Sequence, residues 1–183
     1  GLIDSNNEDI VMISDVDEIP NLKGINFSKI NKYVYAFSQV HSMYKLNLIR
    51  EYGWIGTKLC KKEVLVSPQW LRSLKVKKKY NIFRLDKYFS KTYYSKFKII
   101  DNGGWHFGWL RNSDEIIEKI NSYAHTEHNI NKNNDKNYIE ECMKKNISFL
   151  DNDEKLMLSK NINYLPEHIQ KNTNLYKQWI KEK

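Results

Sequence analysis

The chain is short of cysteine and has no long apolar run. Its two cysteines, Cys60 and Cys142, have neither metal-ligand spacing nor the number that a disulfide framework needs, so we expect two buried thiols. No segment approaches the roughly 18 consecutive apolar residues of a membrane span, and the first residues have no signal-peptide pattern. The sequence also has no internal repeat and no low-complexity linker. These absences exclude a disulfide-rich module, a membrane span within the sequence and a repeat architecture.

The composition is that of one folded, basic domain. A length of 183 residues suits a single domain over residues 1–183 with a real core. Hydrophobic residues make up 40% of the chain and aromatic residues 13%, which excludes a disordered chain. The net charge is +8, carried mostly by lysine. This charge suits anionic ligands such as nucleotide diphosphates, nucleic acid or acidic lipid headgroups.

Two carboxylates follow a short apolar run near the start of the chain. Residues 10–13 are apolar and predict a strand buried on both faces, after which come Asp15 and Asp17. Pro20 then prevents a simple extension of the strand pairing. Ligands of open α/β sheets bind at the carboxyl ends of strands, where these two carboxylates can reach one hard divalent cation. The segment therefore indicates phosphate-ester or nucleotide-sugar chemistry, although a chance Asp-x-Asp in a loop is the alternative.

The rest of the chain contains both predicted strands and predicted helices. Strands are predicted over residues 33–37, 54–66, 82–85 and 98–100, and helices over residues 113–125, 138–145 and from 166 onward. A turn signal at residues 102–104 precedes an aromatic segment in which His106 lies between glycines, where the backbone can approach a ligand. Asn112 or Ser113 is the predicted N-cap of the first helix.

With Asp-Val-Asp-Glu-Ile-Pro at residues 15–20 and Gly-Gly-Trp-His-Phe-Gly-Trp at residues 103–109, the sequence resembles glycosyltransferase family 17. This family includes β-1,4-mannosyl-glycoprotein β-1,4-N-acetylglucosaminyltransferases. The resemblance continues through residues 119–125, 165–166 and 177–179, and so covers nearly the whole chain. Family members carry further strand and helix units before the Asp-x-Asp strand. Because the sequence begins at Gly1, close to that strand, we expect a fragment of a longer protein that lacks part of the donor pocket.

The resemblance implies a fold and an activity. The fold would be a GT-A-like, Rossmann-like α/β fold with an open, mostly parallel sheet flanked by helices, truncated at its N-terminus. The activity would be the metal-dependent, inverting transfer of a hexosamine, N-acetylglucosamine, from a nucleotide sugar such as UDP-N-acetylglucosamine to a glycan acceptor. Mn²⁺ or Mg²⁺ would stabilise the negative charge that builds on the leaving diphosphate. The acceptor and the cellular compartment stay open.

The resemblance also implies a donor and metal site. Asp17 would be a direct metal ligand, and Asp15 would bind the metal, directly or through water, or the donor ribose. His106 would be the third metal ligand, with a stacked or core histidine as the alternative. Glu18 would contact the donor sugar or, as an equal alternative, brace the turn.

The predicted acceptor side depends on aromatic and acidic residues in the second half of the chain. Trp105 and Trp109 would form an apolar platform for a sugar ring, unless they belong to the core. Asp114 or Glu115 would be the general base of an inverting transfer, unless they only cap a helix. Asp101 and Glu127 are the other candidates for the general base. His125, at the end of the predicted helix, would contact phosphate or complement the helix dipole.

Three other functions compete with the transferase. A haloacid-dehalogenase-like phosphatase would use Asp15 as nucleophile and Asp17 as acid and base, but the chain has no matching acidic pair further on. A nucleic-acid-binding module would use residues 75–79 with Tyr80 and Phe83, but it leaves the Asp-x-Asp strand unexplained, so we expect no nucleic-acid partner. The third is a non-catalytic, glycan-binding relative of the transferases.

Overall fold

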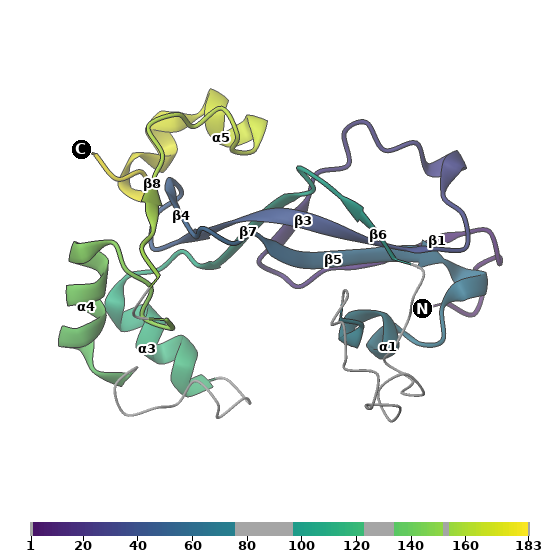
Figure 1. Ribbon diagram of the computed structural model, residues 1–183, viewed down its shortest axis with the longest axis horizontal. Coiled ribbons are helices and arrows are strands. Elements are labelled where there is room, and N and C mark those ends of the chain that lie inside the picture. Colours follow the sequence, from purple (N-terminus) through teal and green to yellow (C-terminus); the bar gives the residue numbers. More distant parts are fainter. Residues whose placement is uncertain (1, 76–96, 123–133, 152–153, 183) are drawn as a thin grey trace, which may run out of the picture. The chain divides into compact units, whose positions relative to one another are not determined.

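A computed structural model describes residues 2–75, 97–122, 134–151 and 154–182 (Figure 1). The chain divides into two compact units, each made of two separate chain segments. Unit 1 consists of Gly1–Gln39 and Trp54–Gly104, and unit 2 of Val40–Gly53 and Trp105–Lys183. The division does not test the prediction of a single transferase domain, which stays a prediction. Each unit is described below by itself.

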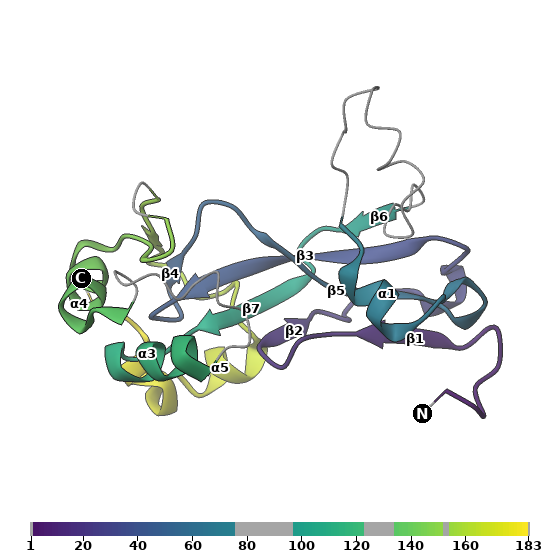
Figure 2. The same ribbon diagram turned by 90° about the horizontal axis from the view of Figure 1, so that it is seen from below.

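Unit 1 is built on a small mixed sheet. Strand β5 (Trp54–Lys61) lies between β1 (Ile10–Ile13) and the first half of β3 (Val34–Met43), and both pairings are antiparallel (Figure 2). On its other side β3 pairs with β6 (Phe97–Ile100) in parallel. The strand predicted over residues 98–100 is therefore confirmed, and the strand predicted at residues 33–37 is longer than expected.

The sequence analysis expected β1 to be buried on both faces, but the strand is only partly buried. Its apolar run does contact apolar clusters on two sides: Ile10 and Met12 pack against one that contains Phe37 and Leu59, and Ile13 against one that contains Leu71. However, β1 is the last strand in the order of the sheet, and only Val11 is classed as buried. Among the described residues, no strand pairs with β1 on the side away from β5, and the other three residues of β1 are half-exposed.

A short helix that the sequence analysis missed completes the apolar cluster that contains Leu71. Strand β5 ends at Lys61, five residues before its predicted end, and a 3₁₀ turn (Lys62–Val64) follows. Ser67 then begins α1 (Pro68–Ser73): its hydroxyl accepts a hydrogen bond from the Trp70 N–H. Proline at the first helical position has the φ angle that a helix needs. Leu71 is fully buried and anchors α1 on the sheet.

A close backbone approach in unit 1 requires glycine at position 104. Strand β2 (Glu18–Pro20) is followed by Asn21, whose N–H donates to the carbonyl of Gly103 at 2.9 Å. Gly104 has φ +126°, and a Cβ there would lie 2.1 Å from the carbonyl oxygen of Ile19. Only glycine fits such a position, so the glycine pair after β6 holds the chain against β2.

Unit 2 combines short strands with helices. The second half of β3 pairs in parallel with β7 (Gly104–Trp109) and antiparallel with β4 (Leu48–Ile49), which in turn pairs antiparallel with β8 (Met157–Leu158). Its helical segments are α3 (Ser113–Ser122), α4 (Lys136–Lys145), α5 (Glu167–Lys171) and a 3₁₀ segment (Thr173–Trp179). Helices α3 and α4 lie side by side over a core that includes Tyr44, Ile116, Ile139 and Phe149 (Figure 1).

The α/β class is confirmed, but the expected mostly parallel sheet is wrong. Of the six strand pairs whose register is described, four are antiparallel and two are parallel. The reason is connection length: β3 and β5 are joined by only ten residues, residues 44–53. Antiparallel strands tolerate such a short link, whereas parallel strands need a crossover of a dozen or more residues.

Most of the other predicted elements are confirmed. The helix predicted from residue 113 is α3, the one predicted over residues 138–145 is α4, and the one after Pro166 is α5. The strand predicted over residues 82–85 lies outside the described residues. Both cysteines are buried and unbridged. Within the described part of the chain, no helix combines the length and the apolar character that a membrane crossing requires.

Candidate functional site

Asp15 and Asp17 lie in a tight turn of unit 1 between β1 and β2. The Glu18 N–H donates to the carbonyl of Asp15 at 3.0 Å, which makes residues 15–18 a β-turn. The hydroxyl of Ser14 donates to the carbonyl of Glu18 at 3.0 Å and so closes the base of the turn. Val16, at its tip, is fully exposed, and Asp15 and Asp17 are half-exposed. The turn therefore presents two carboxylates at its surface.

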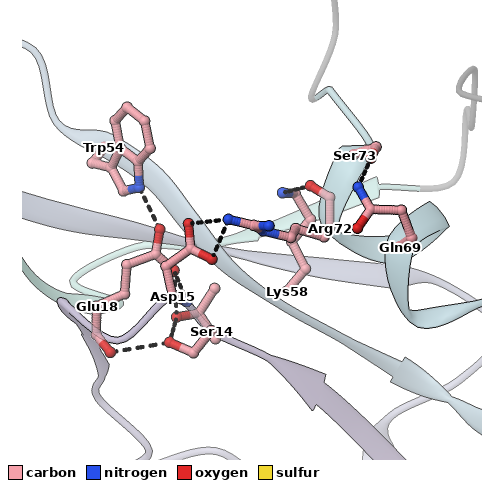
Figure 3. A network of polar contacts seen from close by, with 9 residues as sticks. Ser14, Asp15, Glu18, Trp54, Lys58, Gln69, Arg72 and Ser73 are labelled. Atoms are coloured by element: carbon pink, nitrogen blue, oxygen red, sulfur yellow. Dashed lines mark hydrogen bonds and ion pairs between the residues drawn. The ribbon is translucent and has the colours of Figure 1, made fainter. Parts of the chain in front are cut away.

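A buried carboxylate holds this turn in place. Glu18 is 8% exposed, and its Oε1 accepts a hydrogen bond of 2.6 Å from the indole N–H of Trp54 (Figure 3). Its Oε2 accepts from the Asp15 N–H and from the Thr57 hydroxyl, both at 3.2 Å. Hydrogen bonds to both oxygens offset the cost of burying a carboxylate. The structure thus shows Glu18 in the structural role, in which its hydrogen bonds hold the turn in place. A contact of Glu18 with a donor sugar stays a prediction.

The buried carboxylate of Glu18 lies against Gly56 of β5, where any side chain would collide with it. A Cβ at position 56 would lie 2.6 Å from Oε1 of Glu18 and 2.2 Å from Oε1 of Gln39. Both distances are too short for any larger residue unless these side chains move. Gly56 is therefore part of the support of the turn.

Asp15 also forms an ion pair with the short helix α1. Nη2 of the Arg72 guanidinium lies 3.0 Å from Oδ1 of Asp15 and donates a hydrogen bond to Oδ2 at 3.2 Å (Figure 3). The Lys58 ammonium donates to the backbone carbonyl of Arg72 at 3.0 Å. Burial lowers the pKa of Lys58, while the nearby carboxylates of Glu18 and Asp15 act in the opposite direction. Asp15 therefore lies next to two basic side chains that are far from it in the sequence.

These carboxylates suit a divalent metal. Mg²⁺ and Mn²⁺ prefer oxygen ligands, and Mg²⁺ is commonly held by one or two carboxylates together with phosphate groups of the substrate. A turn that presents Asp15 and Asp17 fits that pattern. No group of three or more His, Cys, Asp or Glu side chains placed to hold a metal occurs among the residues that the structure describes. A two-carboxylate site completed by substrate phosphates does not need such a group.

The third predicted metal ligand belongs to the other unit. His106 lies on β7 in unit 2, opposite His41 of β3, and the two ring centroids are 4.3 Å apart. Both rings are buried, with 8% of His106 and 3% of His41 exposed. The two rings are tilted by 42° to each other, so His106 is the core histidine that the sequence analysis gave as an alternative. A cation shared with Asp15 and Asp17 stays a prediction.

The two predicted platform residues take part in the packing of unit 2. The indole N–H of Trp105 donates to the carbonyl of Tyr164 at 2.6 Å, and its ring packs in the cluster around Leu165. Trp109 is 7% exposed and packs edge-on against Phe149, in a different cluster. Trp109 is therefore a core residue. A sugar-binding role for either ring stays a prediction.

The two candidates for the general base lie at the start of α3. The side-chain oxygen of Asn112 accepts from the Glu115 N–H at 2.9 Å, and the Glu115 carboxylate accepts from the Asn112 N–H at 3.0 Å. This reciprocal pair is a capping box. Asp114 forms an ion pair with Lys136 at 2.7 Å. Helix capping, the alternative that the sequence analysis weighed for Glu115, is observed, and a catalytic role for either carboxylate stays a prediction.

Of the remaining candidates, Asp101 lies exposed in the turn after β6. The others lie outside the described residues, as do most of the basic run and its aromatic neighbours: His125, Glu127, residues 76–79, Tyr80 and Phe83.

Sequence reasoning missed the residues that surround the turn, namely Trp54, Lys58 and Arg72. Lys58 carried the one usable signal, because it is a charged residue inside an otherwise strand-like run. Arg72 follows Asp15 by 57 residues, and nothing local links the two.

Comparisons of the chain with protein-family models, with curated proteins and with solved structures found no match.

Proposed function

We propose that this chain is a metal-dependent glycosyltransferase with Asp15 and Asp17 as its metal-binding carboxylates. The donor would be a nucleotide sugar, with UDP-N-acetylglucosamine as the first candidate, and the acceptor a glycan. The fold would be a GT-A-like arrangement with a mixed sheet. The donor sugar, the inverting course and the GT-A assignment depend on the resemblance of the two sequence motifs to glycosyltransferase family 17.

One observation carries the proposal: the turn at residues 15–18 presents two carboxylates while a third, Glu18, is buried beneath it. A buried carboxylate is costly unless it is fully hydrogen-bonded, and here both oxygens of Glu18 have donors. A turn that only connected two strands would not need a buried acid beneath it. Such support is expected of a site in which ligand atoms must be held in a fixed geometry.

The chemistry of the surroundings agrees with a diphosphate ligand. A bound cation would stabilise the charge that develops on the leaving diphosphate. Asp15 and Asp17 would hold the cation, and Trp54, held by Glu18, would contribute a flat, partly exposed ring beside it. Trp54 is 39% exposed, so part of its ring is accessible to a sugar or a base.

The test is binding of UDP-N-acetylglucosamine measured by calorimetry with and without Mn²⁺. We expect binding that requires the metal and that falls at least about tenfold in Asp17→Asn, because a charged hydrogen-bonding or coordinating partner is lost while the shape is kept. Glu8→Gln, on the same unit but 73% exposed in its side chain, is the matched control and should bind normally.

Two results would contradict the proposal. Metal-independent binding that ignores Asp17→Asn would show that the turn is not the metal site. Hydrolysis of simple phosphate esters that is abolished by Asp15→Asn, without any binding of nucleotide sugar, would favour the phosphatase alternative.

A further inference from the structure

A small pocket of unit 1 lies beside the Asp15 turn. Its volume is about 130 Å³, and its charged lining residues are Asp15, Glu18, Lys58 and Arg72. Pockets that enclose drug-sized ligands have about 300–1,000 Å³, so this one can hold a group of the size of a phosphate and not a whole nucleotide sugar. Its two acidic and two basic side chains cancel in charge. By itself the pocket therefore favours neither a lone cation nor a lone anion.

The ion pair between Arg72 and Asp15 can be exchanged at little cost. The Arg72 side chain is 57% exposed and that of Asp15 is 44% exposed. Water screens ion pairs at such positions, so they contribute little to stability. One guanidinium nitrogen, Nη2, contacts both carboxylate oxygens, at 3.0 and 3.2 Å, and so occupies the same oxygens that a metal ion would use.

Lys58, in contrast, is a fixed cation of the same pocket. It lies on β5 between β1 and β3, paired with Ile13 and Ala36 in the strand register. Lys58 is a half-buried residue, and burial lowers the pKa of its ammonium. The ammonium donates one hydrogen bond to the carbonyl of Arg72, and an ammonium has three donors. A partly desolvated ammonium interacts more strongly with an anion than an exposed one does.

We propose that Arg72 takes the place of the metal ion at Asp15 when no metal is bound, and that Arg72 and Lys58 receive the diphosphate that arrives with the metal. This inference rests on the proposed function. When a divalent cation binds Asp15, it displaces the guanidinium, which then pairs with phosphate oxygens in the forked geometry that arginine favours. The added positive charge of the cation is balanced by the diphosphate. Cation and diphosphate therefore bind cooperatively, and each alone binds weakly.

The test compares the affinity for Mn²⁺ alone with the affinity for UDP in the presence of Mn²⁺. In Arg72→Gln, Asp15 no longer has a competing partner, so Mn²⁺ alone should bind roughly two- to fivefold more tightly. UDP with Mn²⁺ should bind about tenfold more weakly, because a charged hydrogen bond to phosphate is lost. The opposite signs of the two effects are the signature of the exchange.

Two further variants separate the exchange from a general change of charge. Lys58→Met should weaken UDP binding about tenfold. It should tighten the binding of Mn²⁺ alone less than Arg72→Gln does, because the Lys58 ammonium donates to the Arg72 carbonyl and does not occupy the Asp15 oxygens. Lys29→Gln removes an equal charge from an exposed position outside the pocket and should change neither affinity. Thermal unfolding of each variant confirms that it is folded.

The outcomes distinguish this inference from the proposed function. If the wild type binds no UDP with Mn²⁺, or if Asp17→Asn leaves that binding unchanged, both fall. If the wild type binds and Asp17→Asn does not, but Arg72→Gln shifts both affinities in the same direction or neither, only the exchange is overturned.

Discussion

The two sequence motifs, at residues 15–20 and 103–109, differ in whether their polar and aromatic residues are exposed or packed in a core. In the turn of unit 1, a buried residue, Glu18, does the structural work, so Asp15 and Asp17 stay half-exposed at the surface. In unit 2, the motif residues themselves take part in the packing: Trp109 is a core residue, and the indole of Trp105 donates a hydrogen bond to the carbonyl of Tyr164. A motif residue at the surface of a turn that another residue supports is the better candidate for binding, because a ligand can reach it without disrupting the core.

The largest expected difference between the two regions is in stability. Trp109→Ala should lower the free energy of unfolding by about 3–5 kcal/mol, because it empties a packed site against Phe149. Asp17→Asn should change the free energy of unfolding by no more than about 0.5 kcal/mol, as is usual for substitutions near the surface. Urea denaturation of both variants measures the contrast. A loss of under about 1 kcal/mol in Trp109→Ala would show that the ring is not a core residue.

The brace of the turn gives the next largest effect. Glu18→Gln should lower the free energy of unfolding by about 1–3 kcal/mol, because the amide NH₂ of glutamine must face a donor that the carboxylate now accepts from. Glu8→Gln, at an exposed position, is the control and should be nearly neutral. Equal stabilities of the two variants would mean that Glu18 does not support the turn.

The stability at alkaline pH tests whether the Cys60 thiol, close to the polar pocket, is shielded from water. Cys60 is two residues from Lys58 on β5, and burial raises the pKa of its thiol to about 11 from the model-compound value of 9.0. The folded state thus favours the protonated thiol, so stability is lost as the pH rises from about 9 toward 11. The stability gap between wild type and Cys60→Ala should narrow by about 1 kcal/mol from pH 8 to pH 10. A constant gap would show that the thiol is accessible to water.

The smallest effect separates the two roles of Glu115. Glu115→Ala should cost about 1 kcal/mol through loss of the capping box, whereas Glu115→Gln should cost little because its amide oxygen can accept the same hydrogen bond from the Asn112 N–H. Thermal or urea unfolding compares them. Once transfer activity is measurable, a stable but inactive Glu115→Gln would identify a general base, and an active one would leave only the cap.

Local patterns made part of this structure predictable. Asn112 followed three residues later by Glu115 predicts a helix start, and the structure has a capping box there. The carboxylate pair after residues 10–13 was likewise visible as a candidate ligand set. Such features depend on residues within one or two turns of chain.

Contacts between distant residues were not predictable. The pairings of Arg72 with Asp15 and of Trp54 with Glu18 span 57 and 36 residues, and no local rule selects them. The direction of the strands was also missed, because an apolar run such as residues 10–13 has the same appearance in a buried parallel strand and in an edge strand packed on two sides. Gly104 shows a requirement that only the structure reveals, since its φ and its contact with Ile19 depend on β2.

The most direct test of the account is the electron paramagnetic resonance signal of Mn²⁺ in the presence of saturating UDP. The signal of free Mn²⁺ should fall on addition of the wild-type protein and should recover at least in part with Asp17→Asn and with Asp15→Asn, while Glu8→Gln matches the wild type. An equal fall of the signal with all four proteins would contradict the assignment of the metal site to the turn at residues 15–18.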